Sequence, residues 1–361
     1  MTGAQRAEGL EARWSRALDE YVVALEASPD GRWVAVGLGD GRLVVLDGES
    51  GETVASIAAH AHGLFRVAFS PDGGALATSG HDGRARIFEV SGLAHGALAA
   101  RAEVRPGVDW VEQLAWAPSG RWLAVAAGKR LRVVDTAGSV ALARDDAPST
   151  IVDLAWRPGA PATLAASAYG GVELLELDPR DASPLRVRTL DSPGVMSTLA
   201  WRASGDVLAG GLLDGAVRFF RLGRDRPSEM RGYPTKIKAV AFDPAGRALA
   251  TACGELVHLW SFRGAGPEGT APRALEAHAG VVTALAWAPG GRVLVTGGED
   301  GWVVIWDVNR GAPRARAVLP ERVTCVAVTL DGRFALAADA AGSVAALPLT
   351  GDRAAMLGGG R

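Results

Sequence analysis

Histidine, threonine and aspartate recur together at matching positions of two separated segments of the chain. The two sets are His60, Thr78 and Asp82, and His278, Thr296 and Asp300. An imidazole beside a hydroxyl and a carboxylate has the composition of a hydrolytic triad, in which the imidazole accepts the hydroxyl proton. The same groups can instead satisfy one another's hydrogen bonds inside a folded protein. The surrounding sequence decides between these two uses.

Other reactive groups are too scattered to predict a site. Among the six histidines only His60 and His62 are close in sequence, and a metal site needs several converging ligands. The Gly-x-Gly strings resemble hairpin turns rather than phosphate loops, since none follows a strand and opens a helix. The cysteines, Cys253 and Cys325, do not suggest a disulfide framework. We therefore predict no metal, no cofactor and no catalytic residue.

The second polar set lies in the stretch from His278 to Asp307, which predicts three short strands. Apolar runs at 282–288, 293–296 and 303–306 are separated by the turns Pro289-Gly290-Gly291 and Glu299-Asp300-Gly301. β-Branched and aromatic runs between such turns are typical of antiparallel hairpins. Three or four strands cannot bury both faces of their own sheet, so this unit must pack against copies of itself.

Seven further copies of this unit occur along the chain. The matching inner-strand segments begin at Leu25, Val67, Leu114, Leu154, Leu199, Val240, Leu285 and Val326. Pro29 and Leu330 occupy equivalent positions 301 residues and seven steps apart, which is a mean period of 43. A period of this length belongs to a four-stranded propeller blade. The residue before the inner-strand aromatic position is Ala in seven copies and Glu26 in the first, and a small side chain lets neighbouring sheets approach.

The repeats resemble the WD-repeat β-propeller family over nearly the whole chain. The resemblance depends on the period, the Ser-Pro-Asp-Gly-like turns, the Asp-Gly turns and the dipeptide Trp306-Asp307. It implies an all-β propeller, which we expect to have eight four-stranded blades, with seven as the alternative. We treat residues 1–361 as one domain, with 1–12 and 352–361 flexible. Residues 13–18 should supply the outer strand of the last blade and so close the ring.

The same resemblance assigns the His, Thr and Asp sets to structure. It implies a hydrogen-bonded chain in the seventh repeat from Trp306 to Thr296, His278 and Asp300. In the second repeat His60, Thr78 and Asp82 match, but Phe88 replaces the indole and cannot donate. We therefore expect no catalysis from these residues.

Family resemblance also places the inter-blade loops and the Asp-Gly hairpins on one face of the disc, the top face. Large or charged side chains there are the candidates for partner contact, namely Phe65, Arg66, His81, Trp110, Glu112, Asp153, Tyr169, Leu213, Lys238, Glu299 and Trp302. We expect a non-catalytic scaffold that presents these loops to protein partners. The alternatives are a small-ligand or metal sensor in the central channel, or an enzyme with its active site at the channel mouth.

Composition and charge also indicate which ligands and which cellular location to expect. The net charge of −2 argues against nucleic acid as a main ligand, since binding to its backbone requires clustered Lys and Arg. The first 18 residues have no apolar core of signal-peptide length, and no stretch approaches a membrane span. We expect a cytoplasmic protein that is monomeric by itself and makes no membrane contact. Its richness in Ala, Arg and Gly suggests a bacterial source.

Overall fold

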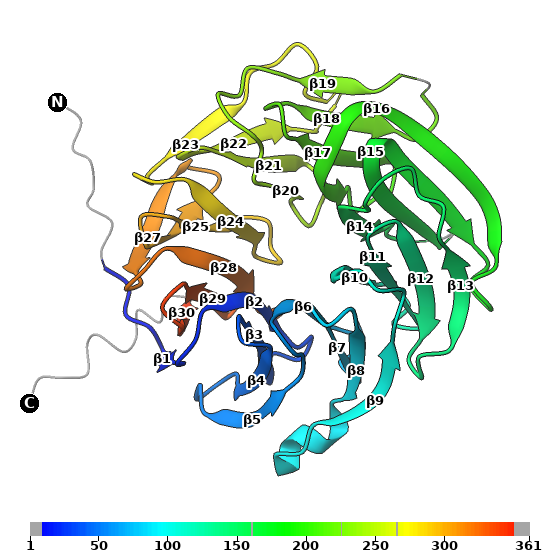
Figure 1. The fold of residues 1–361 in the computed structure, drawn as a ribbon. Coiled ribbons are helices and arrows are strands. Elements are labelled where there is room, and N and C mark those ends of the chain that lie inside the picture. Colours follow the sequence, from blue (N-terminus) through cyan, green and yellow to red (C-terminus); the bar gives the residue numbers. More distant parts are fainter. Residues whose placement is uncertain (1–8, 160–161, 225, 265, 350–361) are drawn as a thin grey trace, which may run out of the picture.

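A computed structural model shows the strands arranged as sheets around a closed ring (Figure 1). It describes residues 9–349 except 160–161, 225 and 265. The expected flexible tail therefore lies outside the described residues, as do residues 1–8. Residues 9–12 lie beside the outermost strand of the seventh repeat, where the Leu10 N–H donates to the Arg316 carbonyl at 2.8 Å. Within the described residues, no helix is long and apolar enough to cross a membrane.

The strands form seven hydrogen-bonded sheets. Six of the sheets have four strands each. Three of these contain repeats one to three: β2 (Val22–Ala27), β3 (Trp33–Leu38), β4 (Arg42–Asp47) and β5 (Thr53–Ala58); β6 (Leu64–Phe69), β7 (Ala75–Gly80), β8 (Ala85–Glu89) and β9 (Ala99–Val104); and β10 (Val111–Trp116), β11 (Trp122–Ala127), β12 (Arg130–Asp135) and β13 (Val140–Arg144). A 3-10 helix, η1 (Ser91–His95), precedes β9.

The other four-stranded sheets contain repeats six to eight. They are β20 (Ala239–Phe242), β21 (Ala248–Cys253), β22 (Leu256–Ser261) and β23 (Arg273–Glu276); β24 (Val282–Trp287), β25 (Val293–Gly298), β26 (Trp302–Asp307) and β27 (Ala312–Val318); and β28 (Val323–Val328), β29 (Phe334–Asp339), β30 (Ser343–Pro348) and β1 (Trp14–Ala17). The predicted closure by the N-terminal strand is confirmed, because β1 pairs antiparallel with β30.

One six-stranded sheet contains repeats four and five, and it corrects our expectation of eight separate four-stranded blades. Its strands are β14 (Asp153–Trp156), β15 (Thr163–Leu177), β16 (Pro184–Trp201), β17 (Val207–Leu212), β18 (Val217–Arg221) and β19 (Ser228–Met230). The loop that joins the two repeats pairs with the preceding hairpin, at Tyr169–Val195 and Gly171–Asp191, so that β16 runs on without a break. Seven, the alternative count, is the number of sheets, although the sequence motif occurs eight times around the ring.

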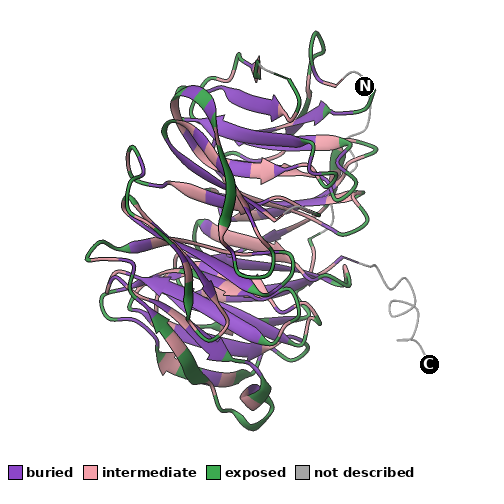
Figure 2. Cartoon of the chain, turned by 90° about the vertical axis from the view of Figure 1, so that its right-hand side faces the viewer, coloured by how far each residue is buried: buried purple, intermediate pink, exposed green. Residues whose placement is uncertain are grey.

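The core lies between neighbouring sheets. Middle strands such as β3 and β7 are buried along their full length because a sheet packs on each of their faces (Figure 2). Val34 and Val36 of the first repeat, for example, cluster with Leu336 and Val344 of the last. The turns from inner to middle strand contain Gly, as at Gly291 with a φ of 65°, a left-handed backbone that other residues rarely adopt.

Indole hydrogen bonds join the inner strands of neighbouring repeats. Four inner-strand Trp side chains donate Nε1–H to an Ala carbonyl of the preceding repeat, at 2.9–3.1 Å: Trp116 to Ala68, Trp156 to Ala115, Trp201 to Ala155, and Trp287 to Ala241. The acceptors belong to the repeated Ala position, where a small side chain leaves the strand open to the next sheet. The indoles therefore orient each inner strand against its neighbour as well as filling the core.

Candidate interaction surface on the top face

Buried polar chains anchor the top of the second and seventh repeats. In the seventh, Trp306 donates to Thr296 Oγ1 at 2.9 Å, Thr296 Oγ1 lies 2.8 Å from His278 Nε2, and His278 Nδ1 lies 3.2 Å from the Asp300 carboxylate. Asp300 also accepts the Trp302 N–H at 3.0 Å. This series of hydrogen bonds thus links the loop before β24 to the turn before β26.

In the second repeat, His60 Nε2 lies 2.7 Å from Thr78 Oγ1 and His60 Nδ1 lies 2.8 Å from Asp82. Phe88 stands at the indole position and donates nothing, while Arg86 pairs with Asp82 at 2.8 Å. Burial lowers the pKa of His60 and His278 against the opposing pull of their aspartates, so both imidazoles are neutral at pH 7. Thr78 and Thr296 are completely buried, so their hydroxyls cannot reach a substrate.

Three of the predicted contact residues converge on the top face. The rings of His81 and Trp110 stack with centroids 4.8 Å apart and planes 14° apart. Phe65 lies 4.2 Å from His81 and 5.9 Å from Trp110, again between ring centroids. We call Phe65, His81 and Trp110 the aromatic cluster. It joins the second repeat to the third, and its Trp110 remains 56 % exposed.

Local backbone geometry places each member of the aromatic cluster. Phe65 is the extra residue of a β-bulge in β6, where the pairing register shifts between Leu64 and Arg66, and bulges re-aim side chains. His81 lies in the turn after β7, and Trp110 directly precedes β10. Sequence reasoning missed Val108, which is 92 % exposed two residues before Trp110. A lone Val between Gly107 and Asp109 gave no signal in the repeat pattern.

The remaining candidates do not join the aromatic cluster. Tyr169 and Leu213 are exposed hydrophobic side chains on repeats four and five, and Lys238 and Glu299 are exposed on repeats six and seven. Trp302 is only partly exposed, because it packs against the core between repeats six and seven with the Arg316 guanidinium 5.8 Å from its ring. Trp302 therefore has a packing role that the sequence did not reveal.

Polar inner-strand residues bond mainly to neighbouring strands. Arg66 donates to Gln113 Oε1 at 3.2 Å, and Gln113 donates to the Val152 carbonyl at 2.8 Å. Asp153 accepts the Leu199 N–H at 2.7 Å, and burial raises the pKa of Asp153 to about 6. Glu112 is a partly exposed bulge residue of β10. No group of three or more His, Cys, Asp and Glu side chains able to hold a metal occurs among the described residues.

Glu26, which replaces the repeated Ala, is a further carboxyl at a joint between repeats and is partly buried. It accepts the Phe69 N–H of the second repeat at 3.1 Å. Burial raises its pKa to about 8, against the opposing effect of that hydrogen bond. The Glu26 carboxyl therefore supplies a hydrogen bond at the joint between repeats one and two, where Phe69 stands at the indole position and has no ring N–H to donate.

Comparison with known proteins connects these features to named relatives. The family described as "WD domain, G-beta repeat" matches residues 51–89 and 269–307, the segments that contain the two buried polar chains. The chain is 29 % identical over 297 residues to the ribosome biogenesis protein WDR12 homolog of Chlamydomonas reinhardtii, covering 79 % of this chain and 62 % of the relative. It is 28 % identical to telomerase protein component 1 of Mus musculus, covering 71 % of this chain but 10 % of that protein.

These relatives are eukaryotic and do not support the bacterial source that composition suggested. The chain spans less than two thirds of the length of either protein. In fold, it is similar to the crystal structure of the computationally designed Ika8 protein, with a TM-score of 0.75, 17 % identity, and coverage of 92 % of this chain and 98 % of that one.

Proposed function

Because the chain is a WD-repeat β-propeller, we propose that it acts as a non-catalytic scaffold that binds protein partners through its top face. The observation behind this proposal is the aromatic cluster of Phe65, His81 and Trp110. Aromatic side chains that are rigidly held and partly exposed supply the desolvated area on which protein interfaces depend. Arg66 and Glu112 lie next to the cluster in sequence and would orient a partner through their charges.

The names of the relatives agree with a role in larger assemblies, since one is called a protein component of telomerase and another a ribosome biogenesis protein. We also propose that the protein is cytoplasmic and monomeric before it binds. The unpaired thiols of Cys253 and Cys325 support a reducing compartment.

We further infer that the six-stranded sheet works as two blades, which would make eight blades in the ring. Two inner strands support this inference, β14 and the second half of β16. Trp201 also bonds to Ala155 across them, in the same way that Trp287 bonds to Ala241 across two separate sheets.

Affinity capture from the native host, followed by partner identification, tests the proposed function. Trp110→Ala should weaken capture of the main partner by more than about 1 kcal/mol, since the truncation removes the largest exposed ring of the aromatic cluster. Folding should be retained because the side chain is 56 % exposed. Leu330→Ala is the control, as it removes a side chain that is 63 % exposed from a turn on the opposite face. Equal retention of partners by both variants would refute the assigned surface.

A further inference from the structure

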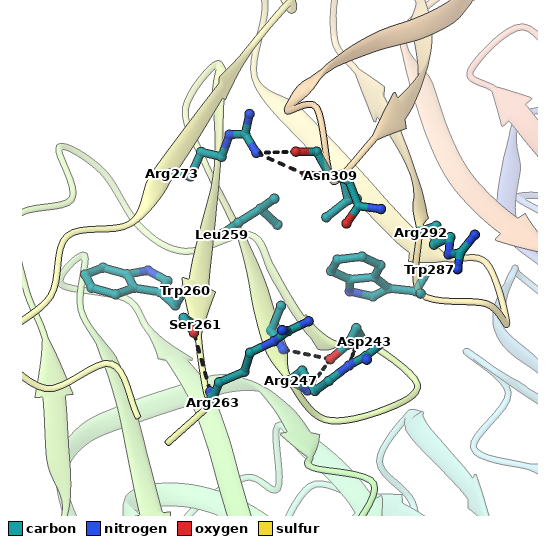
Figure 3. Close-up of a pocket in the computed structure, with 13 residues that line it drawn as sticks. Asp243, Arg247, Leu259, Trp260, Ser261, Arg263, Arg273, Trp287, Arg292 and Asn309 are labelled. Atoms are coloured by element: carbon teal, nitrogen blue, oxygen red, sulfur yellow. Dashed lines mark hydrogen bonds and ion pairs between the residues drawn. The ribbon is translucent and has the colours of Figure 1, made fainter. Parts of the chain in front are cut away.

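A pocket of ≈ 530 Å³ lies between repeats six and seven (Figure 3). The turns that line it are at the opposite ends of the strands from the loops that hold the aromatic cluster, so it opens on the bottom of the ring. Its walls are four turns of repeats six and seven, those between inner and middle strands and those between third and outer strands. It is lined by Asp243, Arg247, Ala248, Leu259, Trp260, Ser261, Arg263, Arg273, Trp287, Gly291, Arg292, Val308 and Asn309. All of the contact candidates predicted from the sequence were placed on the top face, so this site was not predicted.

Two arginines of the pocket, Arg247 and Arg292, occupy a position at which the arginine of other repeats lies over an aromatic ring. In the first, third and eighth repeats the arginine after the turn glycine lies over the next aromatic ring, with Arg32 4.6 Å from Trp33, Arg121 4.9 Å from Trp122 and Arg333 4.9 Å from Phe334. Ala248 and Val293 follow Arg247 and Arg292 instead, so neither guanidinium has the following aromatic side chain that it covers in those repeats. Both arginines are exposed at the pocket.

The residues that line the pocket carry more positive than negative charge. Four arginines and one aspartate give a formal charge of 4 − 1 = +3, in a chain whose net charge is −2. Asp243 lies 3.7 Å from the Arg247 guanidinium, and the Arg273 guanidinium donates to the carbonyls of Val308 and Asn309. Within the part of the chain that the structure describes, the guanidinium groups of Arg263 and Arg292 have no hydrogen-bond acceptor or ion-pair partner.

An apolar surface lies among these charges. Trp287 lines the pocket and is partly exposed, and its indole N–H is already used by the Ala241 carbonyl at 3.1 Å. Its ring face is thus available only for stacking or apolar contact. In Figure 3 the ring lies between Asn309 on one side and Asp243 with Arg247 on the other, and Arg292 is beside it.

We propose that this pocket binds a small phosphorylated ligand with a flat ring, the chemistry of a nucleoside phosphate. Guanidinium groups match phosphate oxygens in geometry and charge, and three surplus positive charges suit a polyphosphate better than a single carboxylate. The flat ring of the ligand would stack on the Trp287 indole, and an inorganic anion has no ring that could do so. The pocket volume is within the range of small-molecule sites. This site is independent of the proposed scaffold function, because it lies on the opposite face.

Calorimetric titration of the full chain with ATP, tripolyphosphate and adenosine tests the proposal. We expect ATP to bind, tripolyphosphate to bind about tenfold more weakly for want of a stacking ring, and adenosine not to bind. Arg247→Ala and Arg292→Ala should each weaken ATP binding by about tenfold or more. Arg32→Ala is the matched control, since it removes an arginine from the same turn position in the first repeat, and it should leave binding unchanged.

Three results would overturn the proposal. If ATP does not bind at about 1 mM, the pocket is not a nucleotide-class site. If Arg32→Ala weakens ATP binding as much as Arg292→Ala, general surface charge accounts for the binding. If tripolyphosphate binds as tightly as ATP, the ligand class is inorganic polyanion and the role assigned to Trp287 is wrong. Melting temperatures of the variants show whether each is folded.

Discussion

At the scale of single residues, the same buried polar chain exists in a complete and a reduced form. Thr296 receives the Trp306 indole N–H, whereas Thr78 has Phe88 at the corresponding position. The two repeats are otherwise matched in their His and Asp partners. A comparison of these two repeats therefore measures how much the indole hydrogen bond contributes to the free energy of unfolding.

We predict that Trp306→Phe lowers the free energy of unfolding by about 1–3 kcal/mol, because it leaves the buried Thr296 oxygen without its donor. A double-mutant cycle with Thr296→Val should give a coupling energy of about 1 kcal/mol, measured by urea unfolding. The corresponding cycle of Phe88→Leu with Thr78→Val should give a coupling within about 0.5 kcal/mol of zero. Equal coupling in the two repeats would contradict a hydrogen-bonded indole.

Glu26 predicts how the stability of the protein depends on pH. Its folded pKa is raised to about 8 from 4.5, so folding favours the protonated carboxyl and stability falls as pH rises from 4.5 through 8. Glu26→Gln keeps an oxygen for the Phe69 N–H but removes the buried charge. We expect this variant to melt higher than the parent above pH 8 and to match it below pH 4.5, in thermal scans across that range. A difference that does not change with pH would refute a buried ionisable Glu26.

The neutral histidines predict the opposite pH response. The folded pKa of His60 and His278 lies below 6.5, so their contribution to stability is complete above pH 6.5 and is lost as pH falls through the lowered folded pKa. Replacing both with Gln should flatten the decline in melting temperature below pH 6.5. A decline as steep as that of the parent would show that other groups cause it.

At the scale of elements, strand β1 completes a sheet whose other members lie at the far end of the sequence. It pairs with β30 from Trp14–Ala346 to Ala17–Ser343, and the Trp14 indole donates to the Gly48 carbonyl of the first repeat at 2.9 Å. The strand thus joins the last repeat to the first as well as covering the edge of β30.

Deletion of residues 1–17 should lower the melting temperature by roughly 5 °C or more, because it exposes the edge of β30 and removes the buried Trp14. Differential scanning calorimetry measures the change. An unchanged melting temperature would mean that β1 adds nothing to the closed ring.

The repeat pattern was sufficient to predict most of the strands, whereas side-chain placement was only partly predictable. The period of 43 and the interleaved Ala positions located the inner strands of all eight repeats, and the closing strand expected at 13–18 is β1. The continuous β15 and β16 were not predictable, because they depend on pairing between a hairpin tip and a connecting loop. The aromatic cluster brings together side chains 45 residues apart, from Phe65 to Trp110, and a bulge aims one of them.

At the scale of the whole molecule, closure gives every sheet two neighbours. Core clusters and indole hydrogen bonds cross the joints between repeats, so loss of one sheet removes contacts from both neighbours. An open array would instead have end repeats with one neighbour each and could unfold from those ends.

We predict that tryptophan fluorescence and far-UV circular dichroism report one coincident urea transition for the full chain. In the chain that lacks residues 1–17, the two signals should separate, because the open ring unfolds first at its free edges. Separate transitions in the full chain would show that closure does not couple the sheets.

The pairing of β1 with β30 also has a consequence for synthesis of the protein. Trp14 leaves the ribosome 346 − 14 = 332 residues before its partner Ala346. At about 5–20 residues per second, β1 waits for roughly 17–66 s with its backbone donors and acceptors unpaired. During that interval the growing ring presents a free strand at one end and an incomplete sheet at the other, the surfaces at which nascent chains on neighbouring ribosomes aggregate. A message broken before codon 343 yields a chain that cannot close, and its open edge distinguishes it from a finished molecule for any protease or chaperone that binds exposed strands.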